Sequence, residues 1–428
     1  MPKGYARYAL AVMVGINFLN YLDRWVPTAA APLIQKEFHL NDFQLGALGT
    51  AFLLVYAVGA LPMGIWADRG IRKNIIGIGV TVWSFATLLS GFTRNFVQLF
   101  LSRAIVGVGE ASYYPAGTSL LGDYFPKSSR GRAMSVWGAG TAFGIAVGFA
   151  GGGLVADAFG WRVAFFMTAI PGLVFGILAF RLREPLRGAA EERGPSLQEV
   201  HHASLRTYLS LLRNRTLRYT ILSQTLLFFV LASNAFFLPL EMTRRFHLSV
   251  GRAGILAGVV VVAGGLIGNL VGGFLSDHRS KTTARGPLEV GIAGFLVGAV
   301  FITVGLLSQT LVFFMLFFLV AVISLYLYSG PFTAIGQNVV VPSLRASAVT
   351  LTLFIAHLFG DSYSTLAVGG LSVIFKSLTT ALLITSPTLL VLAAVAAALA
   401  VPTIQVDMDT AEEAWTQASV EALPLPAL

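Results

Sequence analysis

Long apolar segments recur along almost the whole chain, and they constrain its fold more than any other feature. Each runs for about 20 residues, the length that a helix needs to cross the hydrocarbon core of a bilayer. Inside hydrocarbon, only helices and closed barrels satisfy their own backbone polar groups, and barrel strands would alternate polar with apolar residues. Because 56% of the 428 residues are hydrophobic and 11% are charged, a soluble domain cannot accommodate these segments. The sequence therefore predicts an all-α integral membrane protein.

We expect twelve transmembrane helices, six in each half of the chain. Their predicted ranges are 8–34, 43–67, 74–92, 96–122, 131–157, 161–181, 217–241, 250–276, 287–307, 310–336, 345–374 and 378–402. The predicted domains are an N-terminal six-helix bundle (1–182), a cytoplasmic linker with an amphipathic helix (183–216), a C-terminal six-helix bundle (217–403) and a mobile, acidic cytoplasmic tail (404–428).

The distribution of Lys and Arg predicts the orientation. The face that carries both termini and the linker holds 20 of these residues, the opposite face holds seven, and Arg24 and Arg103 lie inside helices. By the positive-inside rule, both termini are expected in the cytoplasm of a multi-pass cell-membrane protein, with a bacterial inner membrane as the expected location. Topology thus accounts for the net charge of +9 without a nucleic-acid partner.

A repeated loop relates the two halves. Residues 64–73 read GIWADRGIRK, and residues 273–281 read GFLSDHRSK at the corresponding place in the second half. Two six-helix bundles in a parallel pseudo-two-fold repeat, with the substrate bound between them, form the architecture of an alternating-access carrier.

Glycines spaced four apart form a ridge on two of the predicted helices, at Gly140, Gly144, Gly148 and Gly152 and at Gly264, Gly268 and Gly272. Small residues let helix backbones approach closely. Two interpretations are open: static packing between helices, or surfaces on which the two bundles rock.

Four charged residues lie within apolar helices: Asp23, Arg24, Arg103 and Glu110. A central ionised residue costs about 2.5–3.5 kcal/mol on insertion scales, so these groups are expected to pair or to line a wet cavity. We predict that Asp23 and Glu110 carry a coupling proton, while Arg24 and Arg103 hold them and bind an anionic headgroup. The alternative is a purely structural set of ion pairs between the first and fourth helices.

The second half offers weaker candidates for substrate binding. His357 and Asp361 lie four residues apart in the eleventh helix, and Asn234 lies in the seventh. The His–Asp pair either lines a cavity or is structural, and an interhelical hydrogen bond is the alternative for Asn234. Embedded charge in the first half and many Phe and Leu residues in the second would suit an amphipathic substrate.

Several motifs resemble known transporters. Residues 64–73 resemble the signature loop of the major facilitator superfamily, and LSRAIVGVGEASYYPAG (101–117) is similar to its fourth-helix motif. NYLDR (20–24), VGVGEASY (106–113) and EPLRGAAEE (184–192) resemble the spinster family of lipid transporters. This resemblance implies a proton-linked carrier of lysophospholipids or sphingosine-phosphate-like molecules. It also implies that Asp23, Arg24, Arg103 and Glu110 are functional. We further predict that Tyr21, Tyr113 and Tyr114, which lie in or beside these motifs, contact the substrate.

The superfamily resemblance further implies a cytoplasmic latch that steadies the outward-open state. We expected the latch to comprise Asp68, Arg69, Arg72, Asp123 and Asp277. Asp277 matches Asp68 in the second half, but Gln337 stands where the first half has Asp123. The alternative for Arg72 is a surface ion pair that serves topology alone.

Two other functions remained open: a carrier of small organic anions with the same fold, and a non-transporting membrane receptor or scaffold. The GEASY sequence argues against the first. We expected no enzyme activity, because no phosphate-binding loop, metal-ligand cluster or nucleophile with its base stands out, and the chain has no cysteine. Accordingly we expected no cofactor and no metal, with a proton gradient as the energy source, membrane lipids as surroundings and a monomer as the working unit.

Overall fold

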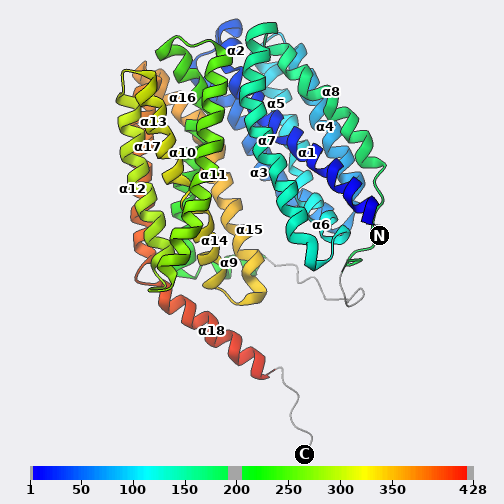
Figure 1. Cartoon of the computed structure of the whole chain (residues 1–428), viewed down its shortest axis with the longest axis vertical. Helices are drawn as coiled ribbons and strands as arrows, with labels where there is room; N and C mark the ends of the chain where they lie inside the picture. The colour runs from blue at the N-terminus through cyan, green and yellow to red at the C-terminus, as the bar shows by residue number, and fades with distance from the viewer. Residues whose placement is uncertain (1–2, 191–204, 422–428) are drawn as a thin grey trace, which may run out of the picture. The chain divides into compact units, whose positions relative to one another are not determined.

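The computed structural model describes residues 3–190 and 205–421, and the regular elements in these ranges are all helical (Figure 1). Each predicted transmembrane segment has a counterpart, shifted by a few residues at its ends. The first half contains α1 (Lys3–Ala29), α2 (Ala31–Phe38), α3 (Asp42–Arg69), α4 (Arg72–Phe92), α5 (Phe96–Ala111), α6 (Tyr113–Tyr124), α7 (Lys127–Phe159) and α8 (Trp161–Phe180).

The second half begins with the short helix α9 (Leu205–Leu211) and ends with a helix beyond the last predicted segment. Its elements are α10 (Arg215–Phe246), α11 (Val250–Ser280), α12 (Gly286–Leu307), α13 (Leu311–Tyr326), α14 (Ser329–Asn338), a 3₁₀ turn (Pro342–Leu344), α15 (Arg345–Ala356), a π-helical turn (His357–Asp361), α16 (Ser362–Phe375), α17 (Leu378–Ala400) and α18 (Ile404–Glu421).

Four of the predicted segments are interrupted. The first is split into α1 and α2 at Ala30, the fourth into α5 and α6 at Ser112, the tenth into α13 and α14, and the eleventh into α15 and α16 by the π-helical turn. By length and hydropathy, ten described helices could cross a membrane. The two predicted segments outside that set are α1 and the α5–α6 pair, which carry the embedded charges.

The described residues group into two compact units that cut across the sequence halves. The first unit comprises 1–200, 233–262 and 362–381, and the second comprises 201–232, 263–361 and 382–428. In the first, α1 packs against α7, α4 against α8, and α16 along α3; in the second, α12 packs against α13. The domain boundaries that the sequence predicts at residues 182, 217 and 403 stay a prediction.

Both glycine ridges pack against a helix from their own half of the sequence. At Gly140, Gly144, Gly148 and Gly152 a Cβ atom would come within 2.9 Å of atoms of α1. At Gly264, Gly268 and Gly272 it would meet α13 or the residue directly after it. These contacts support static packing within each half as the role of these glycines, rather than rocking of one half on the other.

The linker and the tail are partly described. Helix α9 falls within the predicted amphipathic segment, whereas residues 191–204 of the linker lie outside the described residues. The tail was expected to be mobile, but residues 404–421 form helix α18. This helix is joined to the start of α10, because the Thr216 backbone N–H donates to Asp407 at 2.8 Å.

Candidate functional site

Asp23 and Arg24 are adjacent on α1 and contact different helices. The Asp23 carboxylate accepts a hydrogen bond from Thr87 on α4 at 2.8 Å and a short one from Thr168 on α8. Arg24 instead forms an ion pair with Glu110 on α5, with 2.6 Å between Nε and Oε2. Neighbouring residues of a helix point about 100° apart, so Asp23 contacts α4 and α8 whereas Arg24 contacts α5.

Aromatic rings surround the Arg24 guanidinium. Its Cζ atom lies 4.5 Å from the ring centre of Tyr56, 5.0 Å from that of Tyr21 and 5.3 Å from that of Phe52. The faces of aromatic rings attract cations, most strongly where water is excluded. The rings therefore stabilise a charge that hydrocarbon alone would not tolerate. Sequence reasoning missed Phe52 and Tyr56, which look like ordinary members of an apolar helix.

Arg103 shares the Phe52 ring with Arg24. Its Cζ atom is 5.1 Å from the Phe52 ring centre, and it forms neither an ion pair nor a hydrogen bond with the described residues. Its Nη1 and the Oε1 atom of Glu110 are buried without a hydrogen-bond partner among the described residues. A buried charged group without a partner is costly, so these atoms are the ones available to a ligand or water.

Burial distinguishes Arg24 from the other embedded charges. Asp23, Arg103 and Glu110 are at most 4% exposed, whereas 17% of the Arg24 side chain is exposed. The sequence predicts that Arg24 and Arg103 hold the two carboxylates, but among the described residues only Arg24 forms an ion pair with one of them: Thr87 and Thr168 hold Asp23, and Arg24 holds Glu110. Arg24 is therefore the more exposed member of its ion pair with Glu110.

The three predicted tyrosines lie in different surroundings. Tyr21 is half-buried beside Arg24, and Tyr114 is exposed. Tyr113 is buried in the core of the first unit, where its hydroxyl donates to the Met13 carbonyl at 2.8 Å and accepts from Trp137 at 2.7 Å. Because this hydroxyl is already used twice, the structure favours a packing role for Tyr113 over substrate contact.

The His357–Asp361 pair forms as its spacing predicted. The Nδ1 and Oδ2 atoms lie 2.7 Å apart, and the His357 ring packs edge-on against Phe228. Both residues belong to the π-helical turn, a rare element that is often found at functional sites. Asn234, the third candidate from the second half, is buried on α10 and belongs to the first compact unit.

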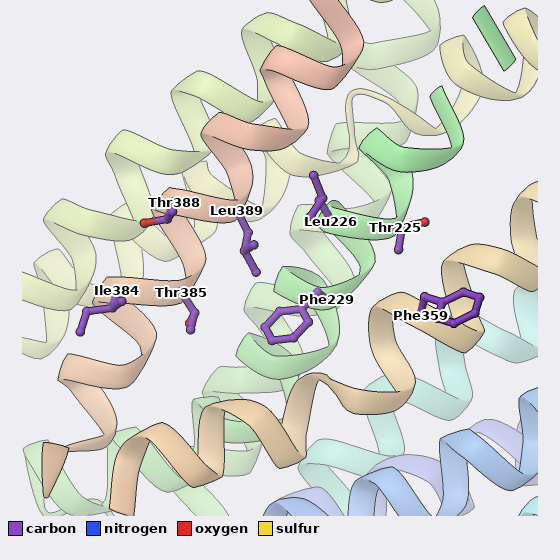
Figure 2. A pocket seen from close by; sticks show the side chains of 8 residues that line it. All are labelled: Thr225, Leu226, Phe229, Phe359, Ile384, Thr385, Thr388 and Leu389. Atoms are coloured by element: carbon purple, nitrogen blue, oxygen red, sulfur yellow. The ribbon is translucent and has the colours of Figure 1, made fainter. Parts of the chain in front are cut away.

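A pocket of about 330 Å³ opens beside the π-helical turn, within the second unit. Figure 2 shows the residues that line it: Phe359 from this turn, Thr225, Leu226 and Phe229 from α10, and Ile384, Thr385, Thr388 and Leu389 from α17. The close approach of the turn to α10 depends on Gly360, where a Cβ atom would lie 2.5 Å from the Thr225 carbonyl oxygen. The lining is mainly apolar and suits a hydrocarbon chain.

The predicted latch is centred on Arg72, which is fully buried rather than a surface residue. Its guanidinium pairs with Asp123 at short range and with Glu184 at 2.7 Å, and it donates to the Pro185 carbonyl at 2.9 Å and to the Ser119 hydroxyl at 3.1 Å. Glu184 opens the EPLRG segment, so the start of the linker completes the cluster. The sequence marks Glu184 only as part of the EPLRGAAEE motif.

Asp68, Arg69 and Asp277 do not join the Arg72 cluster. All three are exposed, and they form no ion pair or side-chain hydrogen bond within the described part of the chain. The end of α3 is instead held by Arg187, which donates to the Ala67 and Gly70 carbonyls at 2.8 and 3.0 Å. A cation at the last carbonyls of a helix is favourable.

The described residues contain no group of three or more His, Cys, Asp or Glu side chains that could hold a metal ion.

Comparison with known proteins gives matches over most of the chain. The model of the Major Facilitator Superfamily matches residues 13–361. Protein spinster homolog 3 of Danio rerio is 31% identical over 395 residues, which cover 85% of this chain and 76% of that protein. A sphingosine-1-phosphate transporter of Danio rerio is 29% identical over 374 residues, covering 83% of this chain and 74% of the relative.

Solved structures agree with this result. A crystal structure of a bacterial homologue of the human lysosomal transporter spinster, in an inward-facing and occupied conformation, is 26% identical, with a TM-score of 0.79. It covers 96% of this chain and 98% of its own. The unoccupied form of a bacterial spinster homologue matches with a TM-score of 0.80 at 25% identity.

Proposed function

Because the chain belongs to the spinster family of the major facilitator superfamily, and is thus a multi-pass membrane transporter rather than an enzyme, we propose that it moves an amphipathic lipid by proton-coupled alternating access. The proposed substrate is a lysophospholipid or a sphingosine-phosphate-like molecule. A relative that is described as a sphingosine-1-phosphate transporter supports this substrate class.

The buried Arg24–Glu110 pair is the observation that carries the proposal. An anionic headgroup that binds Arg24 competes with Glu110 for the same guanidinium. Once its partner is taken, Glu110 would be an unpaired charge among helices, and uptake of a proton removes that cost. Arg103, whose Nη1 has no hydrogen-bond partner among the described residues, is the second cation available to the headgroup. Substrate binding and protonation are thereby linked.

Asp23 has a different part in this proposal. Two threonines from α4 and α8 donate to its carboxylate, and no cation pairs with it among the described residues. A carboxylate held this way joins three helices of one bundle. We therefore assign the coupling proton to Glu110 first, and keep Asp23 as a second carrier whose removal would also weaken the bundle.

The second half would hold the hydrocarbon chain. The pocket beside the π-helical turn is lined by apolar side chains, and the His357–Asp361 pair borders the same turn. We propose that these residues, with Asn234, Tyr21 and Tyr114, contact the substrate. As its surroundings we propose a cell membrane, with both termini in the cytoplasm and a monomer as the working unit.

The test is uptake into proteoliposomes that contain the purified protein, with and without a pH gradient. We expect labelled lysophospholipid, rather than a small organic anion, to accumulate when the gradient is present. Glu110→Gln should abolish the effect of the gradient while leaving exchange of labelled for unlabelled substrate, because the glutamine cannot titrate.

The outcomes separate the alternatives. Accumulation of small organic anions alone would replace the lipid by that substrate class. Binding without exchange would indicate a receptor. If Asp23→Asn loses the effect of the gradient and Glu110→Gln keeps it, the proton site is at Asp23; if both variants keep it, proton coupling through these residues is wrong.

A further inference from the structure

A second buried carboxylate with a charged partner lies at the other end of α3 from the Arg72 cluster. Asp42 is the first residue of α3 and is 8% exposed. Its Oδ2 and Oδ1 accept from Nη1 and Nη2 of Arg244 at 2.9 and 2.5 Å. Ser372 donates to Oδ2 at 2.5 Å, and Gln35 donates to Oδ1 at 2.7 Å. The carboxylate is thus fully satisfied by four hydrogen bonds.

These partners come from both halves of the sequence. Gln35 and Asp42 belong to α2 and α3 of the first half, whereas Arg244 and Ser372 belong to α10 and α16 of the second. The position of Asp42 is fixed locally, because Asn41 and Gln44 form a capping box that sets the first turn of α3. The cluster therefore joins the two repeats at a defined point.

Below the cluster, α3 and α16 run in close contact. The Thr50 and Thr365 hydroxyls are 3.2 Å apart, and Thr365 donates to the Gly46 carbonyl at 2.8 Å. A Cβ atom at Gly46 or Gly369 would overlap the backbone of the facing helix. The seam is thus formed by backbone approach and hydroxyl pairs, with Asp42 as its charged end.

We propose that Asp42 and Arg244 form a lock that holds the two repeats together at this end and that must break in every transport cycle. The inference rests on alternating access in the proposed function. Parting α3 from α10 and α16 would strip three of the four donors from a buried carboxylate at once. Closure at this end is therefore stable until the lock opens as a whole.

The chain contains no cysteine, so a single introduced thiol reports on the seam without interference. Thr365→Cys is labelled with a membrane-impermeant maleimide in cells or in proteoliposomes of known orientation. In this background we expect Asp42→Asn, and separately Arg244→Gln, to raise the labelling rate about tenfold, because weakening one state shifts a two-state equilibrium toward the other. The Arg244 side chain is 39% exposed, so we expect its replacement to disturb packing less than the replacement of a fully buried arginine would.

Glu37→Gln is the matched control. Glu37 pairs with Arg162 at 2.7 Å and accepts from Trp161, but α2 and α8 both belong to the first half. Burial acts to raise the pKa of Glu37, yet the hydrogen bonds from Trp161 and Arg162 outweigh it and hold that pKa below its usual value. Glu37→Gln therefore also removes an ionised carboxylate, but it leaves the contacts between the two repeats at Asp42 unchanged.

An unchanged labelling rate in both Asp42→Asn and Arg244→Gln would overturn the lock, as would an equal increase in Glu37→Gln. Size-exclusion chromatography confirms that each variant is folded. Labelling needs no substrate, so the lock can be upheld even if the lipid assay fails, and it can fail while lipid transport is confirmed.

Discussion

The guanidinium of Arg72 shows how a buried charge is made tolerable in this protein. Every nitrogen of the group has an acceptor: Asp123, Glu184, the Pro185 carbonyl or Ser119. Planar guanidinium groups suit such multiple recognition, which an ammonium cannot reproduce. The side chain therefore ties α4 and α6 to the first residues of the linker.

Arg72→Gln should lower the stability of the protein by about 3–5 kcal/mol, because it leaves two carboxylates without their cation in a buried site. Thermal unfolding in detergent measures the loss. Arg279→Gln removes an exposed ion pair with Glu289 and should cost at most about 1 kcal/mol. Equal losses in the two variants would contradict the role of burial at Arg72.

At the scale of elements, glycine spacing decides which helices approach closely. The ridge on α7 lets α1 pack with its backbone against that helix. The glycines at Gly131 and Gly138 of α7 face open space, with nothing within 4 Å of an added Cβ atom. A side chain is therefore expected to be tolerated at Gly131 and Gly138 but to clash with α1 at the ridge glycines.

Gly144→Ala should destabilise the first unit by about 1–3 kcal/mol, because the new methyl group would lie 2.5 Å from the Phe18 carbonyl oxygen. Gly138→Ala should be neutral or stabilise by up to about 1 kcal/mol, since alanine favours the helix. Melting temperatures of both variants in the same detergent test the contrast. A neutral Gly144→Ala would show that α1 and α7 can separate freely.

At the scale of the whole molecule, the seam between α3 and α16 joins segments more than 300 residues apart in sequence. Both helices belong to the first compact unit, although α16 comes from the second half. The end of α3 that carries Asp42 thus contacts Arg244 and Ser372 of the second half in this structure.

Cysteines at Thr50 and Thr365 should form a disulfide on oxidation, because the hydroxyls that they replace are 3.2 Å apart. If the seam must open in each cycle, the oxidised double variant should lose transport, and reduction should restore it. Each single variant is the control, since neither can cross-link. Full activity with the disulfide formed would mean that transport proceeds while this end stays closed.

Much of the site was predictable at the level of residue type. The cost of charge in hydrocarbon marks Asp23, Arg24, Arg103 and Glu110, and the geometry of a helix separates the directions of Asp23 and Arg24 by about 100°. The identity of their partners was not predictable. Thr87 and Thr168 are common residues in membrane helices, and no local pattern marks them as partners of Asp23.

The sequence by itself determined that this chain is helical and crosses a membrane, where those helices lie, and that the two halves repeat. It did so because bilayer insertion, helix length and motif spacing are local properties, readable within about 20 residues. Tertiary structure alone decided that Glu110 rather than Asp23 pairs with Arg24, that Glu184 completes the Arg72 cluster, and that Asp42 meets Arg244. Those pairings depend on how distant helices pack, and packing is set by contacts that no single segment contains.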